Sequence, residues 1–321
     1  MLIGCDPLKS VETSAGAFSP AQAYWNHRKT LFELKERVLM FSRAADDPIS
    51  LSLYQFAQLM AATLEFTPDL ILELGRKRGN STCAFTEAAN RLGLGTGRVL
   101  SLDLSDSWEQ WTVPRLKANL PESWFAPLTA LKQDILTFDF RSVLARANRV
   151  LVFWDAHGFD VAECILGVIL PELANRAHLV LMHDMSDSRY CLPSTLDYGE
   201  NGIWKGIDFS GPRLKLGNID SAVEQAIAII DFATRNALPL HSADHSFRVE
   251  LGSEPARCAE LTELLGELFS LQAHWFYFSL SEAPGRLTFP KFRPKVERGP
   301  VHIRLLRRIR ERCIYYQRRI L

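Results

Sequence analysis

The sequence contains no run of apolar residues that approaches the length of a membrane span, so no transmembrane helix is expected. Cysteine is sparse: six residues are scattered without C-x-x-C spacing, which argues against a zinc ribbon and favours reduced thiols. Excess charge of either sign is also absent, because 37 lysine and arginine residues balance 37 aspartate and glutamate residues, and no nucleic-acid partner is expected. The first residues lack the apolar segment of a secretory signal. We therefore expect a cytoplasmic protein.

The composition is that of an ordinary globular protein, and changes along the chain indicate three parts. Hydrophobic residues make up 47% of the 321 residues, enough for a large core. We interpret residues 1–60 as an N-terminal arm and a helical cap, since apolar residues recur with helical spacing over residues 21–45 and 53–64. Residues 61–284, with alternating strand and helix patterns, form the expected α/β domain. Residues 285–321 read as a basic linker and a C-terminal basic helix.

The predicted C-terminal helix is amphipathic and rich in arginine. Its apolar residues recur three and four positions apart, and they are Leu306, Ile309, Cys313, Tyr316 and Ile320. Such a helix can lie on an anionic membrane surface, which would place the protein at the inner face of the membrane, or pair with a partner helix. Packing against its own domain, or against a second copy in a homo-oligomer, is the simpler interpretation and is slightly favoured.

The most informative stretch is DLILELGRKRGNSTCAFTEAANRLGLGTGRVLSLD, residues 69–103. Leu70–Leu74 has the continuous apolar character of a strand buried in a parallel sheet. Two glycines bracket the turn that follows, and Asn80 or Ser81 can cap a helix over residues 82–92. A second apolar strand ends at Asp103. The stretch therefore predicts one βαβ unit.

This unit is typical of a site for a nucleoside cofactor. A helix N-terminus after a glycine turn offers free N–H groups, and an acid that ends the next strand can accept bonds from ribose hydroxyls. The glycine spacing differs from the dinucleotide fingerprint G-x-G-x-x-G, because Arg76, Lys77 and Arg78 separate the two glycines. These basic residues favour a bound carboxylate, or they are solvated charges of a loop.

The pattern E-x-G-x-x-x-G-x-S resembles the first motif of class I S-adenosylmethionine-dependent methyltransferases. The resemblance implies that the methionine end of the cofactor is lined by Glu73, Gly75, Gly79 and Ser81, and that Asp103 holds the ribose. It also implies that an acid after the third strand, here Asp134, pairs with the adenine amino group. The alternative is an α/β turn that uses glycine only for tight geometry.

Polar residues also follow the next two predicted strands. Arg149–Trp154 closes on Asp155-Ala156-His157-Gly158, and a strand over residues 178–182 closes on His183-Asp184. Open α/β sheets bind their ligands at this carboxyl edge, so we expect these side chains to gather there. They can share a divalent cation, and oxygen-rich ligation favours Mg²⁺ or Mn²⁺.

These strand-end acids, together with the glycine motif, resemble the metal-dependent macrocin O-methyltransferase and cephalosporin hydroxylase-like group. The resemblance implies that Asp155 and Asp184 hold the metal. The chain departs from the D-x-D-H cluster of that group, because D-A-H-G has His157 in place of the second acid. A site of strand-capping polar groups without an ion is the alternative. With or without a metal, His157 or His183 can take a proton from the reacting hydroxyl.

These observations predict an α/β protein with a Rossmann-like, seven-stranded, mostly parallel sheet and helices on both faces. The remaining strands are predicted at residues 238–251 and 275–280, with a helix over residues 258–269 between them. The expected function is S-adenosylmethionine-dependent methylation of a hydroxyl on a sugar or another small polar metabolite. The alternatives are a nucleotide-dependent oxidoreductase, or a non-catalytic protein that acts through its basic tail.

Overall fold

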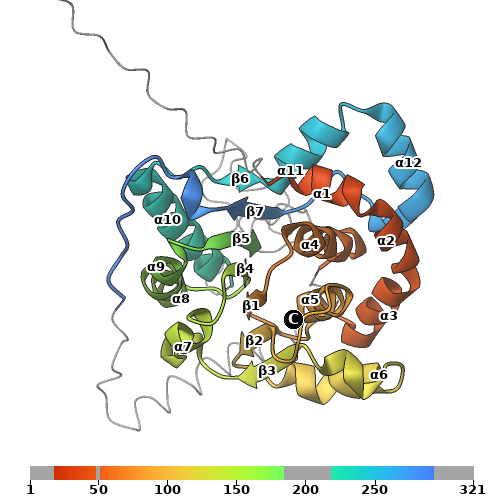
Figure 1. Ribbon diagram of the computed structural model, residues 1–321, viewed down its shortest axis with the longest axis horizontal. Helices are drawn as coiled ribbons and strands as arrows, with labels where there is room; N and C mark the ends of the chain where they lie inside the picture. The colour runs from red at the N-terminus through yellow and green to blue at the C-terminus, as the bar shows by residue number, and fades with distance from the viewer. Residues whose placement is uncertain (1–17, 48–50, 184–217, 293–321) are drawn as a thin grey trace, which may run out of the picture. The chain divides into compact units, whose positions relative to one another are not determined.

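The computed structural model describes residues 18–47, 51–183 and 218–292. The predicted basic helix and Asp184 lie outside these residues. The sheet has seven strands in the order β3-β2-β1-β4-β5-β7-β6 (Figure 1). The strands are β1 (Leu70–Leu74), β2 (Val99–Asp103), β3 (Leu128–Lys132), β4 (Arg149–Trp154), β5 (Ala177–His183), β6 (His241–Ser242) and β7 (Trp275–Phe278). The predicted Rossmann-like sheet is confirmed.

Strands β1 to β5 are parallel, which brings their C-terminal residues to one edge of the sheet, here called the carboxyl edge. Leu74 at the end of β1 is in register with Leu102 in β2 and with Trp154 in β4. Trp154 is in turn in register with Met182 in β5. The chain therefore leaves four neighbouring strands at nearly the same level. The opposite edge, where these strands begin, is called the amino edge. β7 runs antiparallel to β5, so the sheet is mostly parallel, as predicted.

Helices cover both faces of the sheet (Figure 1). One face carries α7 (Phe140–Leu144), α8 (Phe159–Cys164), α9 (Leu170–Leu173) and α10 (Asn218–Asn236). The other carries α4 (Leu53–Phe66) and α5 (Asn80–Arg91), with α3 (Lys35–Ala45) and α6 (Val113–Lys117) beside them. No helix among the described residues is long and apolar enough to cross a membrane.

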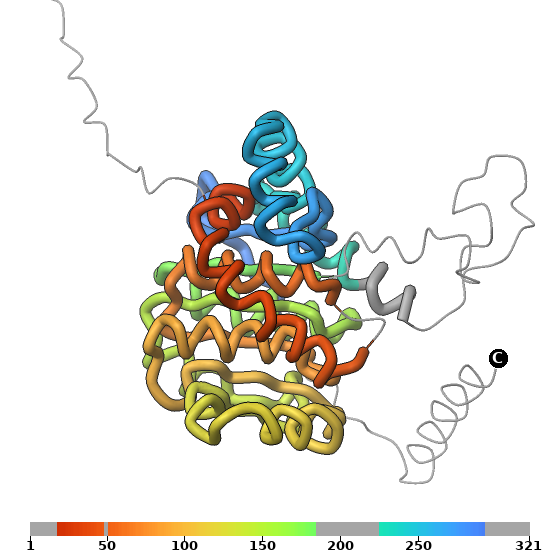
Figure 2. The backbone as a smooth tube through the Cα atoms, turned by 90° about the vertical axis from the view of Figure 1, so that its right-hand side faces the viewer, coloured from red at the N-terminus to blue at the C-terminus, as the bar shows by residue number. Residues whose placement is uncertain are grey.

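The first and last helices of the described chain lie side by side, although they are far apart in sequence (Figure 2). These elements are α1 (Pro20–Asn26), α2 (Arg28–Glu33), α11 (Ala243–Ser246) and α12 (Pro255–Leu265). Tyr24 of α1 is buried between them, and its hydroxyl donates to the carbonyl of Leu268 at 2.5 Å. The N-terminal helices are therefore held by the C-terminal ones.

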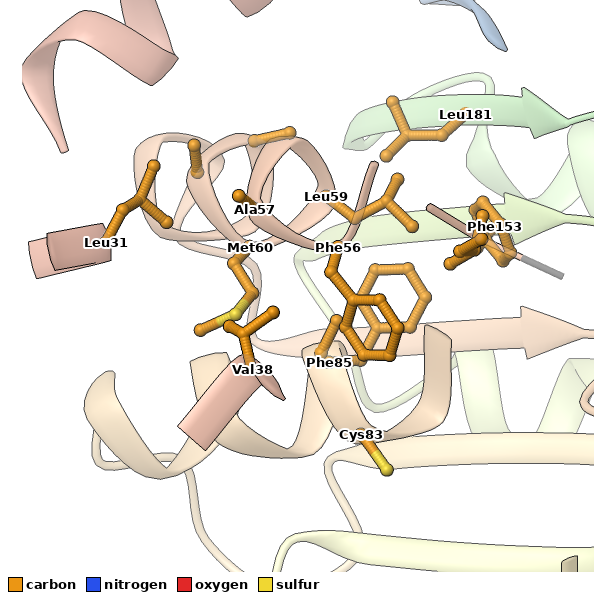
Figure 3. Close-up of a cluster of buried hydrophobic side chains, with 14 of the residues drawn as sticks. Leu31, Val38, Phe56, Ala57, Leu59, Met60, Cys83, Phe85, Phe153 and Leu181 are labelled. Carbon is orange, nitrogen blue, oxygen red and sulfur yellow. The ribbon is translucent and has the colours of Figure 1, made fainter. Parts of the chain in front are cut away.

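The core lies between α4, α5 and the sheet (Figure 3). Phe85 of α5 contacts Phe153 of β4, with ring centroids 5.2 Å apart and the rings steeply inclined. Phe56 and Leu59 of α4 come from the same helix face, and Leu181 of β5 points toward them from the sheet. All five side chains are buried, so this apolar layer fixes α4 against the strands that carry the candidate site.

The predicted strand over residues 238–251 is wrong for most of its length. Only His241–Ser242 pairs with β7, and the chain then turns into α11 and a helical turn over Phe247–Leu251. Phe247 and Leu251 are buried four residues apart on one helical face, which suits helical rather than strand spacing. The Asp244 carboxylate fixes this helical turn to the start of β7, because it accepts bonds from the backbone N–H groups of Ala273 and His274.

Candidate active site

A cavity of about 370 Å³ opens at the carboxyl edge of the sheet, where β1 to β5 end. Its walls come from the segments that follow β1, β2, β3 and β4, and from the last residue of β5. Most of the predicted site residues lie on these walls, namely Gly75, Ser81, Asp103, Asp134, Asp155, His157 and His183. The parallel register described above explains why residues from such distant parts of the chain meet here.

The two glycines of the turn are each required by contacts inside the protein. Gly75 has a positive φ of 95°, and a Cβ there would lie 2.7 Å from the backbone carbonyl of Asp155. Gly79 has a φ of 86°, and its Cβ would lie 2.1 Å from the ring of the buried Trp108. Gly75 therefore allows β1 and β4 to leave the sheet close together. Gly79 does not line the cavity, and it makes room for the Trp108 ring.

Glu73 lies behind the cavity wall rather than on it. Its carboxylate is completely buried and accepts bonds from the hydroxyl groups of Ser81 and Thr82, the latter at 2.7 Å. Burial is the largest influence on this acid, and it raises the pKa of Glu73. The prediction that Asn80 or Ser81 caps α5 is therefore wrong. Gly79 is the N-cap residue of α5, and the Ser81 hydroxyl donates to Glu73.

Asp103 holds the glycine turn in place. One carboxylate oxygen accepts bonds from the backbone N–H groups of Arg76 and Lys77, both at 2.8 Å, and the other accepts from Ser105 N–H at 2.5 Å. An ionised carboxylate offers about four lone pairs, so capacity for a further donor remains on the cavity side. Asp134 also lines the cavity, and one of its carboxylate oxygens accepts from Leu136 N–H at 2.9 Å.

The basic residues of the turn are not equivalent. The Arg76 side chain is buried, donates to the carbonyl of Ser101 at 2.9 Å and forms an ion pair with Glu109 at 3.1 Å. Its Nε is buried without a hydrogen-bond partner among the described residues. The interpretation as solvated loop charges is therefore wrong for Arg76. Burial of Arg76 is not predictable from the sequence, because three consecutive basic residues normally indicate exposure.

The other two basic residues make surface contacts. The Lys77 ammonium pairs with Asp47 at 3.1 Å. The Arg78 guanidinium stacks over Trp111, with its carbon 4.5 Å from the ring centroid, and Arg115 stacks over the same ring at 4.0 Å. Trp111 is thus engaged by cations within the protein, in a cation–π arrangement.

Asp155 and the two histidines line the cavity at the ends of β4 and β5. His183 Nδ1 lies 3.2 Å from Asp155 Oδ1, and no other bond to the Asp155 carboxylate is formed within the described ranges. His157 Nδ1 lies 2.9 Å from Oε1 of Gln225, a buried residue of α10. The amide of Gln225 also donates to the carbonyl of His183 at 3.4 Å. Asp155, His157 and His183 are therefore brought together as the sequence predicted, but by partners that it did not indicate.

A second glutamine reaches the same cluster from α4. Gln55 Nε2 lies 3.1 Å from His183 Nε2 and is 6% exposed. Its sequence signal is a polar residue on a helix that is otherwise mostly apolar, whereas Gln225 gives no signal because its contact with His157 spans 68 positions.

The predicted metal site is only partly within the described residues. Asp155 is placed at the cavity, whereas its predicted partner Asp184 lies outside the described ranges. Within those ranges, no three His, Cys, Asp or Glu side chains are grouped closely enough to hold a metal ion. The Asp155 carboxylate lies 3.2 Å from Nδ1 of the His183 ring.

No protein-family model matches the chain, and no curated protein sequence matches it. Several solved structures are similar. A proposed caffeoyl-CoA O-methyltransferase from Staphylococcus aureus has 12% sequence identity and a TM-score of 0.42 over 67% of this chain and 93% of that chain. An SAH-bound methyltransferase from Podospora anserina has 12% identity and a TM-score of 0.38 over 74% and 93%. An O-methyltransferase from Bacillus cereus in complex with SAH has 13% identity and a TM-score of 0.37 over 66% and 82%. The fold assignment rests on the strand order of this chain itself.

Proposed function

We propose that the chain is an S-adenosylmethionine-dependent O-methyltransferase that acts on a hydroxyl of a sugar or another small polar metabolite. The observation that carries this proposal is a single cavity with two neighbouring sets of lining residues, here called its first and second walls: the glycine turn and Asp103 at the ends of β1 and β2, and Asp155, His157 and His183 at the ends of β4 and β5. The first wall suits a nucleoside and the second suits proton transfer. A methyl transfer to oxygen needs both functions next to each other.

The first wall fits the cofactor by its chemistry. The remaining lone pair of Asp103 accepts a ribose hydroxyl, and the second oxygen of Asp134 accepts the adenine amino group. Gly75 lines the cavity, so the backbone of the turn is available to the amino acid part of the cofactor. Glu73 and Gly79 act from behind the wall, by fixing the start of α5 and the place of Trp108.

When bound, S-adenosylmethionine supplies a methyl group on a positively charged sulfur. The acceptor hydroxyl would lose its proton as it takes up this methyl group, and residues of this chain would receive that proton. His157 donates from Nδ1 to Gln225, so in the neutral ring its Nε2 is the nitrogen that takes this proton. The second oxygen of Asp155 orients the acceptor hydroxyl. Alignment and deprotonation are then the main contributions of this chain.

Metal assistance is a further part of the proposal, and it depends on Asp184 joining Asp155. Membership in the macrocin O-methyltransferase and cephalosporin hydroxylase-like group is also part of the proposal and likewise depends on Asp184 joining Asp155. The steps assigned to His157 and Asp155 above do not pass through an ion. Activity that survives an excess of chelator would support the metal-free reaction, whereas restoration by added Mg²⁺ or Mn²⁺ would support the metal.

Calorimetry on the full chain tests the cofactor assignment. We expect binding of S-adenosylmethionine and no binding of NAD, which separates the proposal from a nucleotide-dependent oxidoreductase. Asp103→Ala should weaken binding, because the ribose loses its acceptor and the turn loses two backbone anchors. Asp106→Ala is the matched control, since Asp106 pairs with Lys132 at the surface three residues away and does not line the cavity. A folded protein that binds no S-adenosylmethionine would contradict the proposal.

A further inference from the structure

Gln55 occupies an unusual place for a buried amide, because it connects the start of α4 to the candidate active site. Its side-chain oxygen accepts bonds from the backbone N–H and the hydroxyl of Ser52, both at 2.9 Å, which closes a capping box. Its side-chain nitrogen donates to the carbonyl of Ala273 at 2.9 Å and lies 3.1 Å from His183 Nε2. The amide thus joins α4, the segment before β7 and the end of β5.

The two backbone partners leave only one orientation for this amide. A backbone N–H can only donate, so the atom facing Ser52 N must be the amide oxygen. A backbone carbonyl can only accept, so the atom facing Ala273 must be the amide nitrogen. A flipped amide would place two acceptors together at Ala273 and two donors together at Ser52. The group that Gln55 presents to His183 is therefore an N–H donor.

This orientation decides where His183 carries its proton. A nitrogen that accepts from Gln55 must be unprotonated, and in a neutral imidazole the other nitrogen then carries the hydrogen. That other nitrogen, Nδ1, faces Asp155 Oδ1 at 3.2 Å. We propose that Gln55 is a positioning residue that fixes the Nδ1–H tautomer of His183, and that His183 in turn holds the Asp155 carboxylate.

The consequence is a division of roles within the cluster. The proton of His183 Nδ1 is directed at Asp155, and its Nε2 lone pair is directed at Gln55, so His183 orients Asp155 rather than acting as the base. One oxygen of Asp155 is held by this bond, and Asp155 lines the cavity. The base is then His157. The catalytic part of this inference rests on the proposed methyltransferase function, whereas the tautomer itself does not.

The chain offers a matched control one helical turn along α4. Gln58 is also buried, and its amide donates to the carbonyl of Gln272 at 2.8 Å while accepting from the Trp275 indole at 3.1 Å. It therefore ties α4 to the same segment that Gln55 contacts, but it does not touch a histidine. Loss of Gln58 removes two buried hydrogen bonds of α4 without removing a hydrogen bond to the His183 ring.

The test is ¹H–¹⁵N correlation spectroscopy of the His183 ring in the full chain, without ligand and at one pH. In the wild type we expect a protonated Nδ1 and an unprotonated Nε2. Gln55→Met should replace this pattern with a mixture of tautomers, and Gln58→Met should leave it unchanged. A wild-type ring with its hydrogen on Nε2, or an unchanged ring in Gln55→Met, would overturn the inference.

Gln55→Glu provides a second variant that keeps the size and the capping box. Its second carboxylate oxygen accepts instead of donating, so His183 Nε2 should gain a hydrogen, with Nδ1 also protonated where the ring becomes an imidazolium beside Asp155. Retention of the wild-type tautomer in this variant would also overturn the inference. If S-adenosylmethionine binds and methyl transfer is found, Gln55→Met should lower kcat about 10- to 100-fold with little change in KM for the cofactor, as is typical for residues that orient a catalytic group. Absence of cofactor binding with an intact tautomer would instead contradict only the proposed function.

Discussion

The two edges of the parallel sheet use their polar side chains in different ways. At the amino edge, side chains bind backbone groups: Asp69 accepts from Asn148 N–H and Arg149 N–H at 2.9 and 3.1 Å. His178, at the start of β5, donates from Nδ1 to the carbonyl of Arg176 and accepts at Nε2 from Leu280 N–H, both at 2.8 Å. At the carboxyl edge of β4 and β5, side chains bind one another: Asp155 pairs with His183, and His157 pairs with Gln225.

The polar side chains of the amino edge therefore contribute to stability, and those of the carboxyl edge are available for the proposed reaction. A side chain that satisfies buried backbone groups has one useful geometry, and its loss leaves those groups without partners. A pair of side chains can exchange partners when a ligand arrives, without disturbing the loops that carry it. Asp103 lies between these cases, because it holds the backbone of the glycine turn and keeps capacity for a ligand. Substitutions at the two edges should therefore have opposite signatures.

The largest expected effect is at the carboxyl edge. Asp155→Ala should lower methyl transfer about 10²- to 10⁴-fold, the usual range for a group that assists proton transfer, while affinity for S-adenosylmethionine changes little. The measurement is transfer of labelled methyl to a panel of sugars and other hydroxylated metabolites, alongside calorimetry with the cofactor. Equal activity of the variant and the wild type would remove Asp155 from the proposed site.

A smaller effect on a different quantity is expected at the amino edge. Asp69→Ala leaves one exposed and one partly buried backbone N–H group without their acceptor, which should lower the free energy of unfolding by about 1 kcal/mol. Urea unfolding measures this change, and cofactor affinity should stay the same. Asp69→Asn keeps one acceptor oxygen and should lose less. A variant with full stability but weakened cofactor binding would break the distinction between the two edges.

Some residues around the cavity were predictable from the sequence and others were not, for a physical reason. Strand β4 was predicted at its observed bounds, because a run of apolar residues bounded by polar ones has few alternatives. Asp155 and His157 followed from it, since residues after a parallel strand lie at the carboxyl edge. Gln225 and the burial of Arg76 were not predictable, because they depend on long-range packing. The strand predicted over residues 238–251 is wrong because the buried residues Phe247 and Leu251 have helical spacing.

The smallest expected effect depends on pH and again concerns the amino edge. Burial lowers the pKa of His178, and the backbone N–H of Leu280 occupies the nitrogen that a proton would need. The unfolded chain therefore binds more protons at this residue than the folded chain below about pH 6.5, the ordinary value for histidine. The contribution of His178 to stability is complete above that pH and is lost as the pH falls, with a slope of at most about 1.4 kcal/mol per pH unit.

His178→Gln tests this pH dependence, because glutamine can accept from Leu280 N–H and does not titrate. Urea unfolding of the wild type and the variant between pH 5 and 8 should give a stability difference that shifts in favour of the variant as the pH falls. Contributions from His157 and His183 at the other edge are present in both proteins and cancel in this difference. Parallel stability curves would show that His178 is not held neutral by the backbone, and the contrast between the two ends of β5 would then be lost.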